Sequence, residues 1–73
     1  MANIKFDIQQ NLGMISEGAK GWKKEFNLIS WNGRDPKYDI RDWDEQHEKM
    51  GKGVTLSKEE VIQLREILNG IEL

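Results

Sequence analysis

The chain has 73 residues, a formal net charge of −2, one histidine and no cysteine. This length allows one domain, residues 1–73, and the composition excludes disulfides and leaves no basis for a structural zinc site or another cofactor. No apolar run approaches the roughly 20 residues that span a bilayer, and the N-terminus lacks a signal-peptide pattern, which favours a cytoplasmic protein without membrane contact.

Three strands are predicted in the first 43 residues. Residues 3–16 alternate Ile4, Phe6 and Ile8, with a bend or bulge expected near residues 9–11. Residues 22–31 and 37–43 form the second and third strands, joined by a turn that contains the pair Asn32-Gly33. The turn length predicts antiparallel pairs whose residue numbers sum to 68, so that Trp31 lies opposite Lys37.

A fourth strand and a helix complete the chain. Residues 52–56 form a short strand, and Ser57 with Glu60 makes a capping box that begins a helix. The helix is expected to continue to about Asn69, with Gly70 as its stop. The order β-β-β-β-α predicts an α+β fold in which a four-stranded antiparallel curved sheet precedes a C-terminal helix. One apolar stripe follows the helix: Val61, Leu64, Ile67, Leu68 and Ile71.

A single sheet covered by one helix leaves apolar surface exposed. A lone core of this size supplies only about 3–5 kcal/mol of stability, and oligomerisation is a common remedy. We therefore expect a homodimer with Leu64, Leu68 and Ile71 at or near the interface.

The second and third strands present two different faces. Even-numbered Phe26, Leu28, Tyr38 and Ile40 are assigned to the core. The odd-numbered face is predicted to lie outside the core, and its cationic and aromatic side chains can bind a phosphate backbone and stack bases. Together with Arg34 in the turn and Lys52 between two glycines, the predicted nucleic-acid-binding residues are Lys23, Asn27, Trp31, Arg34, Lys37, Arg41, Trp43 and Lys52.

The charge distribution agrees with this prediction. Residues 20–41 hold six cations and three carboxylates, a net charge of +3, whereas residues 42–50 and 59–73 each have a net charge of −3. A locally basic segment can attract phosphates although the whole chain is acidic. A mixed, solvated surface is the alternative interpretation.

Several of these residues also have a structural interpretation. Trp31 and Trp43 can pack against a partner subunit or the first strand. Arg41 can pair with Asp39 or Asp42, and Lys52 can stand in a turn. Catalytic or metal-binding motifs are not found: residues 42–48 have His47 where a calcium loop needs glycine, and no triad or Walker motif can be built. The sequence therefore predicts a binding protein and not an enzyme.

Two ordered motifs are similar to a known family. Tyr38-Asp39-Ile40-Arg41-Asp42-Trp43 precedes Lys52-Gly53-Val54-Thr55-Leu56-Ser57, which opens the helix. This order resembles the C-terminal domain of the transcriptional coactivator positive cofactor four, most closely its small bacterial YdbC-like branch, over about residues 22–69. The resemblance implies a homodimer of β-β-β-β-α subunits that binds single-stranded nucleic acid without marked sequence preference.

The resemblance also implies roles for single residues. By position, Trp31 matches an aromatic that stacks on bases, Arg34 a turn cation, Arg41 the arginine of Asp-Ile-Arg, and Lys52 the lysine of Lys-Gly-Val-Thr-Leu. The chain departs from the eukaryotic relatives at Asn32, where they carry lysine, and one position after Trp43, where they carry their second aromatic. It also lacks their Ser/Lys-rich regulatory tail, so their coactivator function is not transferred.

Our hypothesis from the sequence is sequence-independent binding of single-stranded DNA by a homodimer, in transcription, replication or repair. Two alternatives stay open at this point: a protein-interaction module, or an RNA-binding chaperone that uses the same basic and aromatic face. No feature points to recognition of a 2′-hydroxyl, so the sequence does not separate DNA from RNA.

Overall fold

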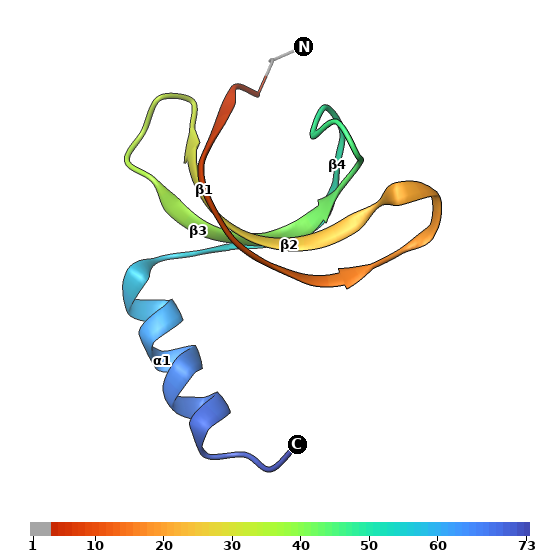
Figure 1. Cartoon of the computed structure of the whole chain (residues 1–73). Helices are drawn as coiled ribbons and strands as arrows, with labels where there is room; N and C mark the ends of the chain where they lie inside the picture. The colour runs from red at the N-terminus through yellow and green to blue at the C-terminus, as the bar shows by residue number, and fades with distance from the viewer. Residues whose placement is uncertain (1–3) are drawn as a thin grey trace.

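The structure, a computed structural model, describes residues 4–73. It consists of β1 (Phe6–Glu17), a short 3₁₀ turn (Ala19–Gly21), β2 (Lys23–Trp31), β3 (Lys37–Trp43), β4 (Met50–Leu56) and α1 (Lys58–Asn69). The strands form one antiparallel sheet in the order β1-β2-β3-β4. Figure 1 shows that the sheet curls into an open half-barrel and that α1 lies on its convex side. The predicted β-β-β-β-α architecture is confirmed; the predicted start of the first strand at Asn3 lies outside the described residues.

Three irregularities in β1 accompany this curvature. The pairing of β1 with β2 shifts register between Ile8 and Gln10, between Asn11 and Gly13, and between Met14 and Ser16. A β-bulge adds a residue to one strand of a pair, bends that strand and increases its twist. The sequence predicted one bend near residues 9–11, whereas three shifts bend the whole length of this edge strand. The residues that face one side after these shifts are Phe6, Ile8, Asn11, Met14 and Glu17, opposite Trp31, Ile29, Asn27, Glu25 and Lys23.

The turn between β2 and β3 is a tight Asn-Gly turn, as predicted. Asn32 and Gly33 have φ of 52° and 73°, and the Arg34 N–H donates to the Trp31 carbonyl at 2.9 Å. Positive φ at both central residues matches the right-handed twist of a hairpin. The predicted register is wrong by two residues, because paired numbers sum to 66, with Ile29 opposite Lys37. A shift of two preserves side-chain parity, so the two faces keep their members.

The assignment of these faces to core and solvent is wrong. The buried residues of the two central strands include the odd-numbered Glu25, Asn27, Ile29, Asp39 and Trp43. The even-numbered Phe26, Leu28, Tyr38 and Ile40 remain partly exposed. Residue alternation defines two faces, but the sheet's curvature decides which one becomes enclosed. Here the odd-numbered face lines the concave interior.

The helix begins as predicted and packs loosely. The Glu60 N–H donates to Ser57 Oγ at 3.1 Å, and the Ser57 N–H donates to Glu60 Oε1 at 2.8 Å, which confirms the capping box. The helix ends at Asn69, although Gly70 has φ of −95° and not a left-handed conformation. Leu64 is partly buried, whereas Ile67, Leu68 and Ile71 are exposed by 53%, 48% and 48%. Within residues 4–73, no helix has the length and apolar character needed to cross a membrane.

Candidate nucleic-acid interface

A row of aromatic rings crosses the concave face. The Phe6 ring centroid lies 6.2 Å from that of Trp31 and 5.0 Å from that of Trp43. The Trp43 ring lies 5.7 Å from the ring of His47 in the loop between β3 and β4. Tilted rings at such distances add specific attraction to the burial of their surface. The curvature thus joins rings from β1, β2, β3 and a loop into one cluster.

Trp43 belongs to the core of this cluster. Its exposed fraction is 0%, as is that of Asn27. The prediction that these two side chains are exposed is wrong, since neither has surface for contact with a base. The physical reason is the bend of β1, which places Phe6 against Trp43 and Asn11 against Asn27. The interpretation that Trp43 packs against the bent first strand is the one that the structure supports.

Trp31 retains some exposed surface and has a cation above its ring. The Arg41 Cζ atom lies 4.9 Å from the ring centroid. Such a cation–π contact is worth about 0.5–2 kcal/mol, depending on its desolvation. The indole N–H of Trp31 is buried and has no hydrogen-bond partner among residues 4–73, so contacts of the ring faces hold this side chain. The structure therefore brings together Trp31 and Arg41, as predicted from their shared face.

Arg41 is held in place by a buried carboxylate. Arg41 Nε and Nη2 donate to the two oxygens of Asp39 at 2.6 and 2.9 Å, and Thr55 Oγ1 donates to Asp39 Oδ2 at 2.8 Å. Asp39 is 0% exposed and the Arg41 side chain is 15% exposed. A bidentate pair of this kind fixes the orientation of the guanidinium as well as its position. The pairing of Arg41 with Asp39 was one of the open alternatives, whereas the sequence did not indicate the contribution of Thr55.

Gly53 makes room for Arg41. The two residues are cross-strand partners, and a Cβ atom at Gly53 would overlap Arg41 Cβ and approach the Ile40 carbonyl oxygen to 2.5 Å. A glycine inside a strand often marks such a close approach. The sequence signal was present in Gly51-Lys52-Gly53, but it could not name the side chain that needs the space.

The other predicted cations lie around the concave face and not together. Arg34 stands in the β2–β3 turn next to Trp31, and Lys37 begins β3; both are exposed. Lys23 begins β2 opposite Trp43, at the far end of the hairpin, and is partly buried. Lys52 is exposed on the edge strand β4, where the pairing with β3 shifts register. The cation–π pair of Trp31 and Arg41 thus has two exposed cations, Arg34 and Lys37, on the side of the β2–β3 turn.

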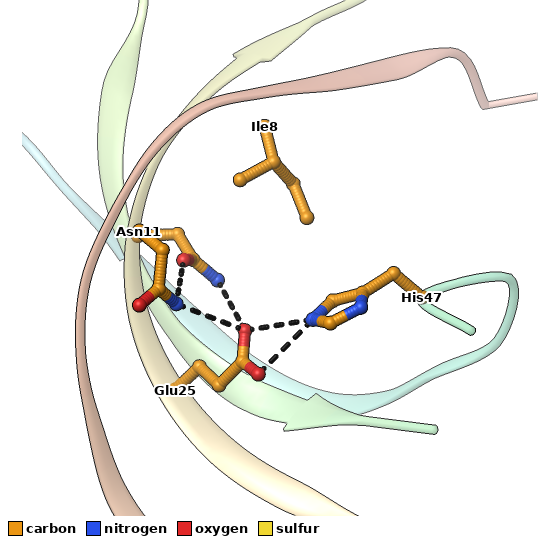
Figure 2. A pocket seen from close by; sticks show the side chains of 5 residues that line it. Ile8, Asn11, Glu25 and His47 are labelled. Carbon is orange, nitrogen blue, oxygen red and sulfur yellow. Dashed lines mark hydrogen bonds and ion pairs between the residues drawn. The ribbon is translucent and has the colours of Figure 1, made fainter. Parts of the chain in front are cut away.

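A polar cluster that the sequence did not predict lies farther along the same face. Glu25 is buried, and His47 Nε2 lies 2.9 and 3.0 Å from its two carboxylate oxygens. Asn11 and Asn27 donate to Glu25 Oε1 at 3.3 and 3.2 Å. Together with Ile8, these side chains line a pocket of about 410 Å³ (Figure 2). The sequence signal for this cluster was that Glu25 and Asn27 are both odd-numbered and so share a face of β2. His47 is brought to them by the loop between β3 and β4, where it has φ of 57°.

No group of three or more His, Cys, Asp and Glu side chains within residues 4–73 could hold a metal ion. The polar side chains of the concave face instead hold one another. A curved antiparallel sheet with aromatic and cationic side chains on its concave face is the kind of surface on which single-stranded nucleic acids are bound.

The comparison with known proteins agrees with this class. Residues 19–67 match the family described as Transcriptional Coactivator p15 (PC4). An uncharacterized protein of Treponema pallidum (strain Nichols) is 47% identical over 71 residues, which cover 97% of this chain and 84% of the relative. The chain belongs to the transcriptional coactivator p15 (PC4) family, and the resemblance noted from its two motifs is confirmed. This is a non-enzymatic family whose members bind single-stranded DNA. The matched residues include β2, β3 and β4 but not β1.

Proposed function

We propose that this protein binds single-stranded DNA on the concave face of its sheet, with weak dependence on sequence. The observation that supports this most directly is the partly exposed Trp31 ring with the guanidinium of Arg41 fixed above it, in a member of a family that binds single-stranded DNA. A base stacked on an aromatic side chain contributes about 1–3 kcal/mol and any base can do so. Trp31 is the stacking residue in this proposal.

Phosphate contacts come from the cations around the ring. An arginine side chain has five N–H donors, and three N–H directions of Arg41 are occupied by Asp39 and by Met50 Sδ, which lies 3.5 Å from Nη1. The remaining donors of Arg41 are available to a phosphate oxygen. Arg34 and Lys37 extend this basic edge, and Lys23 and Lys52 contribute at its far end and at β4. Asn27 and Trp43 are left out, because both are fully buried.

The proposal includes a homodimer. In one subunit, the helix exposes Leu68 and Ile71, and the convex face exposes 49% of Val54 beside the partly exposed Phe26 and Ile40. An 8.5 kDa chain with so much uncovered apolar surface is stabilised when a second copy covers it. A symmetric pair in which Leu64, Leu68 and Ile71 meet on the convex side leaves both concave faces open to DNA.

The test is a titration with oligo-dT, oligo-U of equal length and a duplex, each at two salt concentrations. We expect oligo-dT to bind more tightly than the duplex, with affinity that falls steeply as salt rises because counterions are released. Equal affinity for the duplex would refute the stacking part of the proposal. The absence of any salt-dependent affinity for nucleic acid would refute the function. Tighter binding of oligo-U would assign the site to RNA.

A further inference from the structure

Glu25 is a buried carboxylate that faces an open pocket. Its side chain is only 8% exposed, and it lies on the same concave face as the buried Ile29 and Trp43. Figure 2 shows the side chains of Ile8, Asn11, Glu25 and His47 pointing toward one another around the pocket. Burial of a charge costs free energy unless hydrogen bonds compensate for it, so the partners of Glu25 indicate what the pocket can accept.

The two oxygens of this carboxylate are unequally occupied. Oε1 accepts from Asn11, Asn27 and His47, at 3.3, 3.2 and 2.9 Å. Oε2 has one partner within residues 4–73, His47 Nε2 at 3.0 Å, which is the same nitrogen that contacts Oε1. An ionised carboxylate offers about four acceptor positions. Oε2 therefore keeps acceptor capacity on a side chain that is nine-tenths buried, and a ligand that donates a hydrogen bond would use it.

The pocket has the size and lining of a small-ligand site. Its volume of about 410 Å³ lies within the range of roughly 300–1,000 Å³ that is usual for such sites. Ile8 provides an apolar wall that suits the face of a planar ring, whereas Glu25 and the two amides provide polar atoms at the other side. This combination fits a nucleobase that carries a hydrogen-bond donor at its edge. It disfavours an anion, which the carboxylate of Glu25 would repel.

The position of the pocket relates it to the proposed stacking site. Glu25 and Trp31 lie on the same face of β2, six residues apart along the strand. The curl of the sheet brings the two places toward each other, because Arg41, the cross-strand partner of Glu25, has its guanidinium carbon 4.9 Å from the Trp31 ring centroid. The two places are thus neighbours on the concave face, and two bases of one bound strand would occupy them. A base that stacks on Trp31 is held without discrimination, but a base at Glu25 meets a directional acceptor.

We infer that the Glu25 pocket binds the exocyclic amino group of one base in the bound strand, so that this position is recognised selectively. The inference rests on the proposed binding of single-stranded DNA. Guanine, cytosine and adenine each carry an amino group that a carboxylate can accept from, as glutamate does from cytosine N4. Thymine has no amino group, and its one ring donor on that edge, N3–H, stands between two carbonyl oxygens that would face the carboxylate. His47 is a positioning residue that holds Glu25 and does not itself select the base.

The test uses oligo-dT in which one central thymine is replaced. Deoxyguanosine is compared with deoxyinosine, which differs from it by the absence of the 2-amino group, and deoxycytidine is compared with thymidine. One hydrogen bond to a charged group corresponds to roughly 10- to 150-fold in affinity. If the pocket prefers guanine, this difference in affinity should appear between deoxyguanosine and deoxyinosine. If it prefers cytosine, the difference should appear between deoxycytidine and thymidine. A third pair, deoxyadenosine and purine deoxyriboside, tests adenine.

Matched variants assign the effect to the pocket. Glu25→Gln keeps the side-chain volume but removes the charge and one of the two acceptor oxygens. It should therefore lower the ratio of the affinities for the oligonucleotides with and without the amino group. Glu48→Gln removes the same charge from an exposed position of the neighbouring loop and should keep the ratio, which separates selectivity from general attraction of DNA. An undiminished ratio in folded Glu25→Gln would overturn the inference. If Glu25→Gln does not fold, the side-chain amide signals of Asn11 and Asn27 in the unmodified protein replace it, and they should shift more with the guanine oligonucleotide than with the inosine one if guanine is preferred.

The outcomes distinguish this inference from the proposed function. If oligo-dT binds and all substituted oligonucleotides bind equally, the pocket inference is wrong and the proposed function stands. If oligo-dT does not bind at all, the proposed function itself fails.

Discussion

The ion pair between Arg41 and Asp39 predicts that removing one partner destabilises the protein more than removing the other. Arg41→Ala leaves Asp39 at 0% exposure with Thr55 Oγ1 as the one remaining side-chain donor to its carboxylate within residues 4–73. Removing one member of a buried pair in this way costs about 3–5 kcal/mol, because an uncompensated charge stays in the interior. Asp39→Ala is expected to cost less, about 1–3 kcal/mol, because the long Arg41 side chain is already 15% exposed and can carry its charge to water.

The double variant completes a thermodynamic cycle. Replacing both residues by alanine removes both charges, so its cost should be smaller than the sum of the single costs by about 1–3 kcal/mol. Urea unfolding followed by tryptophan emission, at one fixed protein concentration, gives the three free energies of unfolding. The reasoning would be refuted if Asp39→Ala were as destabilising as Arg41→Ala. It would also fail if the cycle were additive within about 0.5 kcal/mol.

Three further changes test the binding face and the dimer. Trp31→Ala should weaken oligo-dT binding by about 1–3 kcal/mol with an unchanged salt slope, since no phosphate contact is lost; a shallower slope in fluorescence titrations would contradict this. Gly53→Ala should weaken oligo-dT binding and lower the urea midpoint, because the new Cβ displaces Arg41, and a wild-type affinity and midpoint would show that the strand adjusts. Leu68→Asp changes a residue that one subunit leaves 48% exposed, so a stable monomer would lose little stability, whereas the proposed dimer should dissociate in sedimentation at low micromolar concentration. An unchanged dimer would place the interface elsewhere.

Elements that depend on neighbouring residues could be predicted from the sequence. The Asn32-Gly33 turn needs positive φ at two successive residues, and the capping box needs only Ser57 and Glu60 three positions later. The third strand, residues 37–43, has the predicted ends. The predicted faces of β2 and β3 also kept their members, although the register was wrong by two, because side chains alternate with a period of two.

The inside and the outside of the sheet could not be predicted in the same way. Parity groups Trp31, Arg41 and Trp43 on one face, but it does not say whether that face is enclosed. The enclosure depends on how far three register shifts bend β1, and a bend is a property of the paired strands and not of any short segment. For this reason Trp43 was assigned to DNA and is found in the core.

The candidate pocket shows the same division between sequence and structure. The sequence by itself determined the order of the elements, their turns and caps, and which side chains share a face, because these follow from residues a few positions apart. Only the tertiary structure placed His47 against Glu25, 22 positions away, and Thr55 against Asp39, 16 positions away. Such contacts depend on the curvature of the sheet and on the path of the β3–β4 loop, which arise when all four strands pair, and no local pattern encodes them.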